Sequence, residues 1–319
     1  MNKDNVRILV IGAGVNGSIC AAGLHNAGID VTLLARGKRY EEIREGGIVI
    51  EDPFKKTRSV TKVPVINHLD LEDTYEYILV VIRKNQVPDL LPTLAQNRSP
   101  NLVFMINNPS GPEIFTQALG KERVLLGFVF GAGKREGSII RAISGFGGSR
   151  NATPFGELDG RITPRLTRLV DIFNRAGLNA KVSTEMIDYL ATHAAFVAPV
   201  ARAIILHHCD NYALARSSAD LDLLADALRE TFDVLRAVGV KITPRRMAVV
   251  FNIIPKFILV AAMRRLFATR FAEVGGAWHC SQAPDEMRQL GLELMALVEK
   301  SRLPAPALRK LFANNSREE

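Results

Sequence analysis

Cysteine is rare in this chain of 319 residues, which contains three. Cys20, Cys209 and Cys280 are far apart, odd in number and without a Cys-X-X-Cys pair. This distribution argues against a disulfide framework and against a cysteine-based zinc site. It agrees with a reducing compartment, so we expect a cytoplasmic protein.

Aromatic side chains are also few, with one tryptophan and five tyrosines. The net charge is +8, but the lysines and arginines are scattered along the chain. Nucleic-acid binding favours a basic patch with aromatic platforms for the bases, so we expect no nucleic-acid partner. The excess positive charge instead suits small anions, such as a dinucleotide phosphate and a carboxylate substrate.

An uninterrupted membrane-length apolar segment is missing. The most hydrophobic window is Met247–Met263, in which Pro255 and Lys256 break the run near its middle. We expect a buried helix pair or a subunit interface there, and no membrane partner. As a hypothesis, this segment forms a homodimer interface.

A metal site is not expected either. His207, His208, Cys209 and Asp210 have ligand chemistry, but they are consecutive in the sequence. The side chains of adjacent residues diverge and rarely converge on one ion.

What the chain does contain is a strand, glycine turn, helix and second strand within residues 7–38. The apolar run Arg7–Ile11 leads into GAGVNG, and the helix Ser18–Asn26 follows and ends near Gly28. This GxGxxG spacing, between a strand and a helix, predicts a loop that holds a dinucleotide pyrophosphate at the helix N-terminus. The loop residues predicted to bind the cofactor are Gly12, Ala13, Gly14, Val15, Asn16 and Gly17.

The second strand, Asp30–Ala35, ends without the acidic residue that an NAD site normally offers to the ribose hydroxyls. Arg36 follows it, and Lys38 lies close by. We therefore predict NADP(H) as the cofactor, with Arg36 on the 2′-phosphate. The alternative is that Arg36 and Lys38 are solvated loop charges.

The remaining pattern predicts an α/β protein of two domains. Further apolar strands, including Tyr77–Ile82 and Leu102–Ile106, extend the sheet of a Rossmann dinucleotide-binding domain over residues 1–182. An all-α domain follows over residues 183–319. Its expected helices lie at residues 184–207, 219–238, 244–269, 284–301 and 304–312.

Several motifs together resemble the ketopantoate reductase (2-dehydropantoate 2-reductase) family. They are GAGVNG, the arginine at the strand end, VIRKNQV, INNPSG and PDEMRQL with the later LPAP. The resemblance implies NADPH-dependent reduction of a 2-keto acid to a 2-hydroxy acid. It also implies a helical domain like that of 6-phosphogluconate dehydrogenase.

The resemblance assigns three residues directly. Lys84 matches the family lysine near the cofactor, and Asn108 matches the asparagine that helps hold nicotinamide and substrate. Glu286 matches the acidic residue on the substrate side. An alternative for Glu286 is that it only complements the dipole at its helix N-terminus. Pro109 stands where the family usually has glycine.

The family's catalytic lysine is missing. The lysine belongs to the first helix of the all-α domain. In one alignment of this helix with the family, Tyr189 takes the place of the lysine and His193 that of the asparagine four residues later. Matching through Pro199 instead places Leu190 and Ala194 there. Residues four apart share one helix face, so Tyr189 and His193 are a candidate acid pair. The alternative is that both are packing residues.

We therefore expect an NADP(H)-dependent oxidoreductase in which Tyr189, His193 and Glu286 are catalytic candidates. The alternative is a non-catalytic NADP(H)-binding sensor or regulatory protein that has lost its proton donor.

Overall fold

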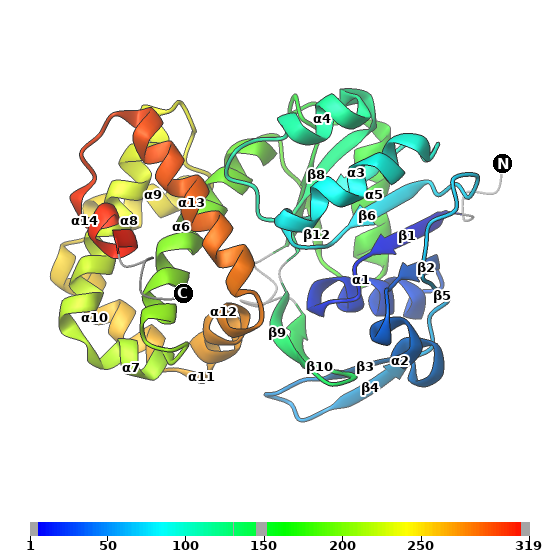
Figure 1. Cartoon of the computed structure of the whole chain (residues 1–319), viewed down its shortest axis with the longest axis horizontal. Coiled ribbons are helices and arrows are strands. Elements are labelled where there is room, and N and C mark those ends of the chain that lie inside the picture. Colours follow the sequence, from blue (N-terminus) through cyan, green and yellow to red (C-terminus); the bar gives the residue numbers. More distant parts are fainter. Residues whose placement is uncertain (1–5, 130, 145–151, 314–319) are drawn as a thin grey trace. The chain divides into compact units, whose positions relative to one another are not determined.

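A computed structural model describes residues 6–129, 131–144 and 152–313 (Figure 1). The chain forms two compact units. The first runs to Ile106 and resumes from Pro112 to Met186, and the second comprises Asn107–Gly111 and the chain from Ile187 onwards. The segment Asn107–Gly111 therefore leaves the first unit and packs with the second.

The first unit is built on a sheet of eight strands in the described residues, in the order β12-β11-β8-β7-β6-β1-β2-β5. All neighbouring pairs are parallel except β8 and β11. Because β1 lies between β2 and β6, the chain adds strands first on one side of β1 and then on the other, as in a Rossmann fold. The strands are β1 (Arg7–Ile11), β2 (Asp30–Leu34), β5 (Val65–Ile66), β6 (Tyr77–Val80), β7 (Leu102–Phe104), β8 (Val124–Gly127), β11 (Thr153–Gly156) and β12 (Ala180–Val182).

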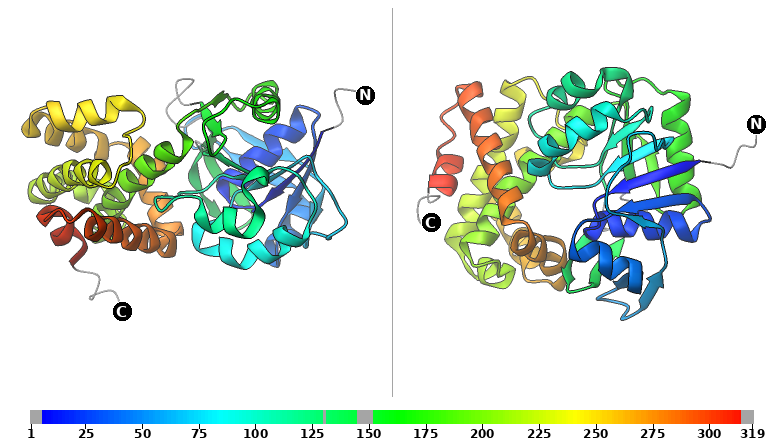
Figure 2. Two further views of the ribbon diagram at one scale, coloured as in Figure 1. Left: turned by 90° about the horizontal axis from the view of Figure 1, so that it is seen from above. Right: turned by 45° about the vertical axis from the view of Figure 1, so that its right-hand side comes forward.

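Helices cover both faces of this sheet (Figure 2). Strand side chains alternate between faces, so Val10 packs with Cys20 of α1 and Leu166 of α5 in one buried cluster. On the other face, the Phe104 ring stacks on Phe115 of α4, with ring centroids 4.2 Å apart. The helices are α1 (Val15–Asn26), α3 (Val87–Gln96), α4 (Glu113–Leu119) and α5 (Pro164–Arg175).

A second sheet in this unit has the order β4-β3-β10-β9. A hairpin is formed by β9 (Gly131–Glu136) and β10 (Ile139–Ser144). It joins β3 (Ile48–Glu51) and β4 (Arg58–Thr61), which follow the short helix α2 (Lys38–Gly46). This pairing of distant segments had no signal in the sequence.

The second unit is helical, with α6 (Met186–Leu206) at its centre. Ala194, Ala198 and Ala201 of α6 belong to the large apolar core of the unit. The helical region expected over residues 244–269 is two helices separated at Pro255, the residue expected to break it. The other helices are α7 (Asn211–Arg216), α8 (Ser218–Ala237), α9 (Arg245–Ile253), α10 (Lys256–Phe267), α11 (Arg270–Ala272), the π-helix Glu273–Ala277, α12 (Trp278–Gln282), α13 (Pro284–Ser301) and α14 (Pro306–Phe312).

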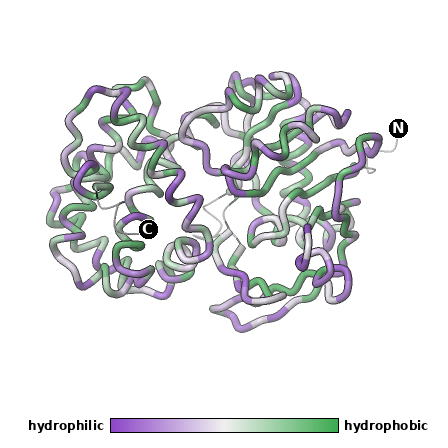
Figure 3. The backbone as a smooth tube through the Cα atoms, in the orientation of Figure 1, coloured by the Kyte–Doolittle hydropathy of each residue, from purple (hydrophilic) through white to green (hydrophobic). Residues whose placement is uncertain are grey.

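Helix α6 is long and apolar enough to cross a bilayer by length and composition. However, 61% of its apolar window is buried inside the protein, as in the core helix of a globular domain. In the first unit, the hydrophobic residues are concentrated in the central strands (Figure 3). The α/β fold class predicted from the sequence, a Rossmann unit and an all-α unit, is confirmed.

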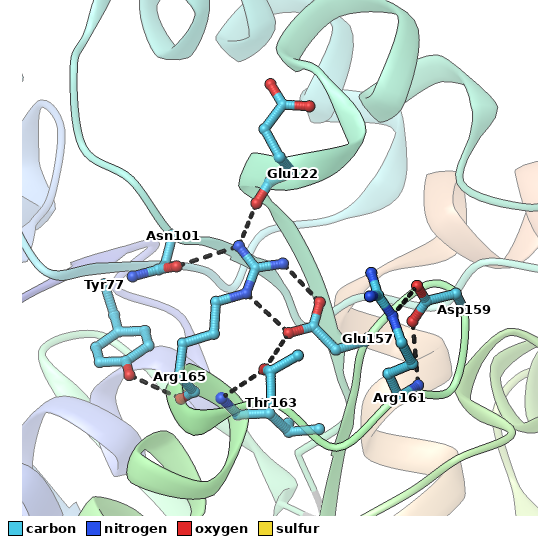
Figure 4. Close-up of polar contacts among 9 residues, drawn as sticks. Tyr77, Asn101, Glu122, Glu157, Asp159, Arg161, Thr163 and Arg165 are labelled. Carbon is cyan, nitrogen blue, oxygen red and sulfur yellow. Dashed lines mark hydrogen bonds and ion pairs between the residues drawn. The ribbon is translucent and has the colours of Figure 1, made fainter.

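A buried ionic network fixes the start of α5 in the first unit (Figure 4). The Glu157 side chain is 6% exposed, and Arg165 binds both of its oxygens, at 2.8 and 2.5 Å. Thr163, the N-cap of α5, donates its hydroxyl proton to the same carboxylate. Arg165 also donates to the side-chain oxygen of Asn101. The carboxylate therefore ties the loop before α5 to the sheet.

Glu157→Ala should destabilise the protein by roughly 3 kcal/mol, because it leaves a partly buried guanidinium without its carboxylate. Urea denaturation measures the change. The control is Asp159→Ala, which removes an exposed ion pair with Arg161 two residues away and should have a much smaller effect. Equal losses in the two variants would contradict a structural role for the Glu157 network.

Candidate functional site

The glycine loop between β1 and α1 depends on two close backbone approaches. Gly12 has a φ of +112°, and a Cβ there would lie 2.3 Å from the carbonyl oxygen of Val81. A Cβ at Gly17 would lie 1.7 Å from the carbonyl oxygen of Gly12. Neither distance is possible for a side chain, so both positions require glycine. These contacts seat α1 directly against the end of β1.

Gly14 has a different role in the loop. It is the N-cap of α1, where no side chain accepts a hydrogen bond from the first helical amides. A Cβ at Gly14 would meet nothing within 4 Å. The positive end of the helix dipole therefore faces open space, which is the arrangement that receives a phosphate. The loop fits the pyrophosphate of a dinucleotide.

Arg39 holds this loop from α2. Its buried guanidinium donates from Nε to the carbonyl oxygen of Ala13 at 3.2 Å and from NH1 to that of Ser138 at 2.9 Å. It also pairs with Glu42 at 3.2 Å, and burial lowers its pKa. Arg36, by contrast, is exposed after the end of β2. The neighbouring arginines thus differ: Arg39 braces the loop, and Arg36 is accessible to a ligand.

The other predicted cofactor residues with side-chain or positional evidence are Asn16, Lys84 and Asn108. The side-chain oxygen of Asn16 is buried, without a hydrogen-bond partner among the described residues, and lies beside Gly131. Lys84 begins a short 3-10 helix, Lys84–Gln86, just beyond the carboxyl end of β6. Because β6 pairs with β1, Lys84 is at the same sheet edge as the glycine loop. Asn108 belongs to the segment that packs with the second unit.

Asn107 and Asn108 make different contacts. Asn108 donates to the carbonyl oxygen of Gly111 at 2.7 Å and closes the turn, while its own side-chain oxygen is buried and unpartnered among the described residues. Asn107 donates to the Glu286 carboxylate at 3.0 Å. The contact between segments 179 residues apart was not predicted, because the motif alone pointed to Asn108.

Glu286 lies in the first turn of α13 and is 5% exposed. Its second oxygen lies 3.6 Å from Nε2 of His279, a residue of α12. His279 was not predicted from the sequence, because a histidine seven residues before an acidic residue has no recognised spacing. The carboxylate is held between an amide and an imidazole of the second unit.

Tyr189 and His193 lie one turn apart on α6, as expected. Their rings are nearly parallel, with centroids 6.3 Å apart and planes at 8°. Burial raises the pKa of Tyr189. Burial, followed by the positive charge of His279, lowers the pKa of His193 to about 4. At neutral pH the pair is a phenol and a neutral imidazole, which can donate hydrogen bonds but do not release protons readily.

The structure brings the candidates together in two groups. The glycine loop, Arg36 and Lys84 lie in the first unit, whereas the second unit holds Tyr189, His193, His279 and Glu286. Among the described residues, no group of three or more His, Cys, Asp or Glu side chains is placed to hold a metal ion.

Comparison with known proteins finds a matching family model and two similar sequences. Residues 8–157 match the family model described as ketopantoate reductase PanE/ApbA. The 2-dehydropantoate 2-reductase of Pyrococcus horikoshii is 25% identical over 187 residues, and the uncharacterized oxidoreductase YkpB of Bacillus subtilis is 27% identical over 185. The alignments cover 58% and 56% of this chain and the same shares of the two relatives.

Solved structures share the fold over nearly the whole chain. A 2-dehydropantoate 2-reductase from Geobacter metallireducens has a TM-score of 0.76 and 17% identity, with 96% of this chain and 97% of that one covered. A D-mandelate dehydrogenase in complex with NADH and anilino(oxo)acetate has a TM-score of 0.74 and 14% identity, with 96% and 95% covered. At these identities the likeness concerns the fold.

The family match covers the glycine loop and the strands that carry the predicted cofactor residues. It confirms the resemblance expected from the sequence motifs. Over residues 8–157, the chain is similar to the ketopantoate reductase family.

Proposed function

We propose that this protein is an NADPH-dependent reductase that converts a small 2-keto acid to a 2-hydroxy acid. The observation that carries the proposal is the open glycine loop at the end of β1, followed by an exposed arginine where an NAD site has an acid. The family match supports the reaction class.

The preference for NADPH rests on Arg36. Its side chain is exposed just after β2, where the ribose of a dinucleotide lies in this fold. An arginine there offers charge-assisted hydrogen bonds to a 2′-phosphate and no acceptor for free ribose hydroxyls. The neighbouring Arg39 is committed to the loop, so it does not provide this charge.

Arg36→Ala should raise the dissociation constant for NADPH roughly tenfold to a hundredfold, because a hydrogen bond to a charged group contributes about 1.5–3 kcal/mol. The constant for NADH should stay within about twofold, since NADH lacks the phosphate. Fluorescence titration of both nucleotides measures this, with Lys38→Ala as the control for loss of a nearby charge. Equal or tighter binding of NADH by the wild type would refute the preference.

The second unit supplies the groups for the substrate. When bound, the reduced nicotinamide supplies a hydride, and the carbonyl oxygen then gains negative charge. The hydroxyl of Tyr189 stays protonated because burial raises its pKa. It can therefore donate a hydrogen bond to that oxygen. Asn107 and Glu286 offer further polar groups for orienting the substrate.

A panel of 2-keto acids, ketopantoate included, should reveal turnover by the decrease in NADPH absorbance. Tyr189→Phe should lower kcat by about tenfold to a hundredfold, because it removes one donor to the developing charge. The affinity for NADPH should not change. Tyr75→Phe, a tyrosine of the first unit, is the control. Tight NADPH binding without turnover of any keto acid would instead support a non-catalytic sensor.

We also propose a homodimer formed through α9 and α10. Large apolar side chains are exposed around the break at Pro255, with Ile253 72% and Phe257 74% exposed. Large apolar side chains exposed close together in the sequence favour an interface, and twofold self-association is the commonest kind of oligomer.

Phe257→Asp should produce a monomer, because a twofold interface buries the substituted charge in both subunits. Sedimentation equilibrium at micromolar concentration measures the mass. Ile162→Asp, at an exposed apolar residue of the first unit, should leave the dimer intact. A wild-type protein of monomeric mass would refute this assembly.

A further inference from the structure

The proposed reduction needs a proton for the carbonyl oxygen, and neither residue of the expected acid pair releases one readily at neutral pH. We propose that His279 is the catalytic proton donor, oriented by the buried carboxylate of Glu286. This inference rests on the proposed reductase function and assigns its acid to a residue outside the family motifs.

The contacts of Glu286 define the arrangement. One carboxylate oxygen accepts a hydrogen bond from Asn107 at 3.0 Å, and the other lies 3.6 Å from Nε2 of His279. The Glu286 side chain is 7% exposed and that of His279 is 42% exposed. The carboxylate is therefore held inside the unit, while the imidazole extends from it towards the surface. A ring in this position can meet a ligand and regain a proton from water.

A carboxylate beside one ring nitrogen orients an imidazole for proton transfer through the other nitrogen. Here the Glu286 carboxylate lies 3.6 Å from Nε2, which leaves Nδ1 as the nitrogen that we assign to the substrate. Imidazole is the side chain most often used for proton transfer in enzymes. His279 is thus better suited than Tyr189 to supply the proton, and Tyr189 remains a hydrogen-bond donor.

The backbone that carries His279 is fixed by its own polar contacts. The π-helix Glu273–Ala277 comes directly before α12, and such helices are frequent at functional sites. The Glu273 carboxylate accepts hydrogen bonds from the Tyr212 hydroxyl at 3.0 Å and from Nε1 of Trp278 at 3.2 Å. These bonds hold the turn next to His279 against α7.

His193 lies close enough to His279 to respond to its charge. That charge adds to burial in lowering the pKa of His193 to about 4. Around neutral pH His193 is therefore uncharged, so we do not assign the donor role to it.

The proposed reduction conserves atoms and charge. The carbonyl carbon accepts the hydride from NADPH, and the carbonyl π bond breaks. The carbonyl oxygen takes the proton as the Nδ1–H bond of His279 breaks and an O–H bond forms. The neutral ring then regains a proton from water. The sum is 2-keto acid, NADPH and one proton giving 2-hydroxy acid and NADP⁺.

Steady-state kinetics of the full-length protein with NADPH and an active 2-keto acid test this role. His279→Gln should lower kcat by about a hundredfold to a thousandfold, as for loss of a general acid, without changing the affinity for NADPH. His279→Lys should recover at least part of the rate, since an ammonium can donate the proton. The matched control is His207→Gln, which alters another imidazole–carboxylate pair, His207 with Asp220 at 3.0 Å, and should retain the wild-type kcat.

A second measurement does not depend on turnover. Trp278 is the single tryptophan of the chain and precedes His279 directly. Oxamate, an unreactive analogue of a 2-keto acid, should change Trp278 fluorescence in the presence of NADP⁺. His279→Gln should bind oxamate about fivefold more weakly, because one hydrogen bond to the ligand is lost.

Different results would refute the donor role of His279 and the reductase function. An active wild type whose His279→Gln variant keeps kcat within about threefold would overturn the donor role and leave the reductase function standing. An active wild type in which oxamate does not alter Trp278 fluorescence would also overturn it. A wild type that reduces no 2-keto acid would overturn the reductase function and the donor role together.

Discussion

The contact of Gly17 with the carbonyl of Gly12 is the constraint on which the nucleotide-binding unit depends. A side chain at Gly17 would push α1 away from the end of β1, because its Cβ would lie 1.7 Å from that oxygen. The helix amides would then move from the place where a pyrophosphate meets them. Arg39 reinforces the same arrangement, since it binds the Ala13 carbonyl on one side and the β9–β10 hairpin on the other. The second sheet is thereby coupled to the loop.

Two buried carboxylates show how similar residues serve different purposes. Glu157 is fully engaged by the guanidinium of Arg165 and the hydroxyl of Thr163, so its charge is neutralised within the structure. Glu286 has an amide and a partly exposed imidazole as its partners. The Glu157 carboxylate stabilises a loop, whereas the Glu286 carboxylate orients His279, the proposed proton donor.

Much of the first unit was predictable because its signals are local. The strand Arg7–Ile11, the glycine spacing and the following helix occur within one short segment, and the structure confirms all three. The parallel strands were recognised by their apolar runs. The break at Pro255 was also expected from the sequence. The pairing of β3 with β10 was not predicted, since it joins segments far apart in the sequence.

The sequence by itself determined the Rossmann class, the glycine loop and the arginine after the second strand, because each depends on neighbouring residues and backbone sterics. Tertiary structure decided which arginine braces the loop and which is exposed, since Arg36 and Arg39 differ in burial and not in chemistry. It also decided that Asn107 and His279 meet at Glu286. Burial and long-range contact set the partners and exposure of these groups, and local spacing encodes neither.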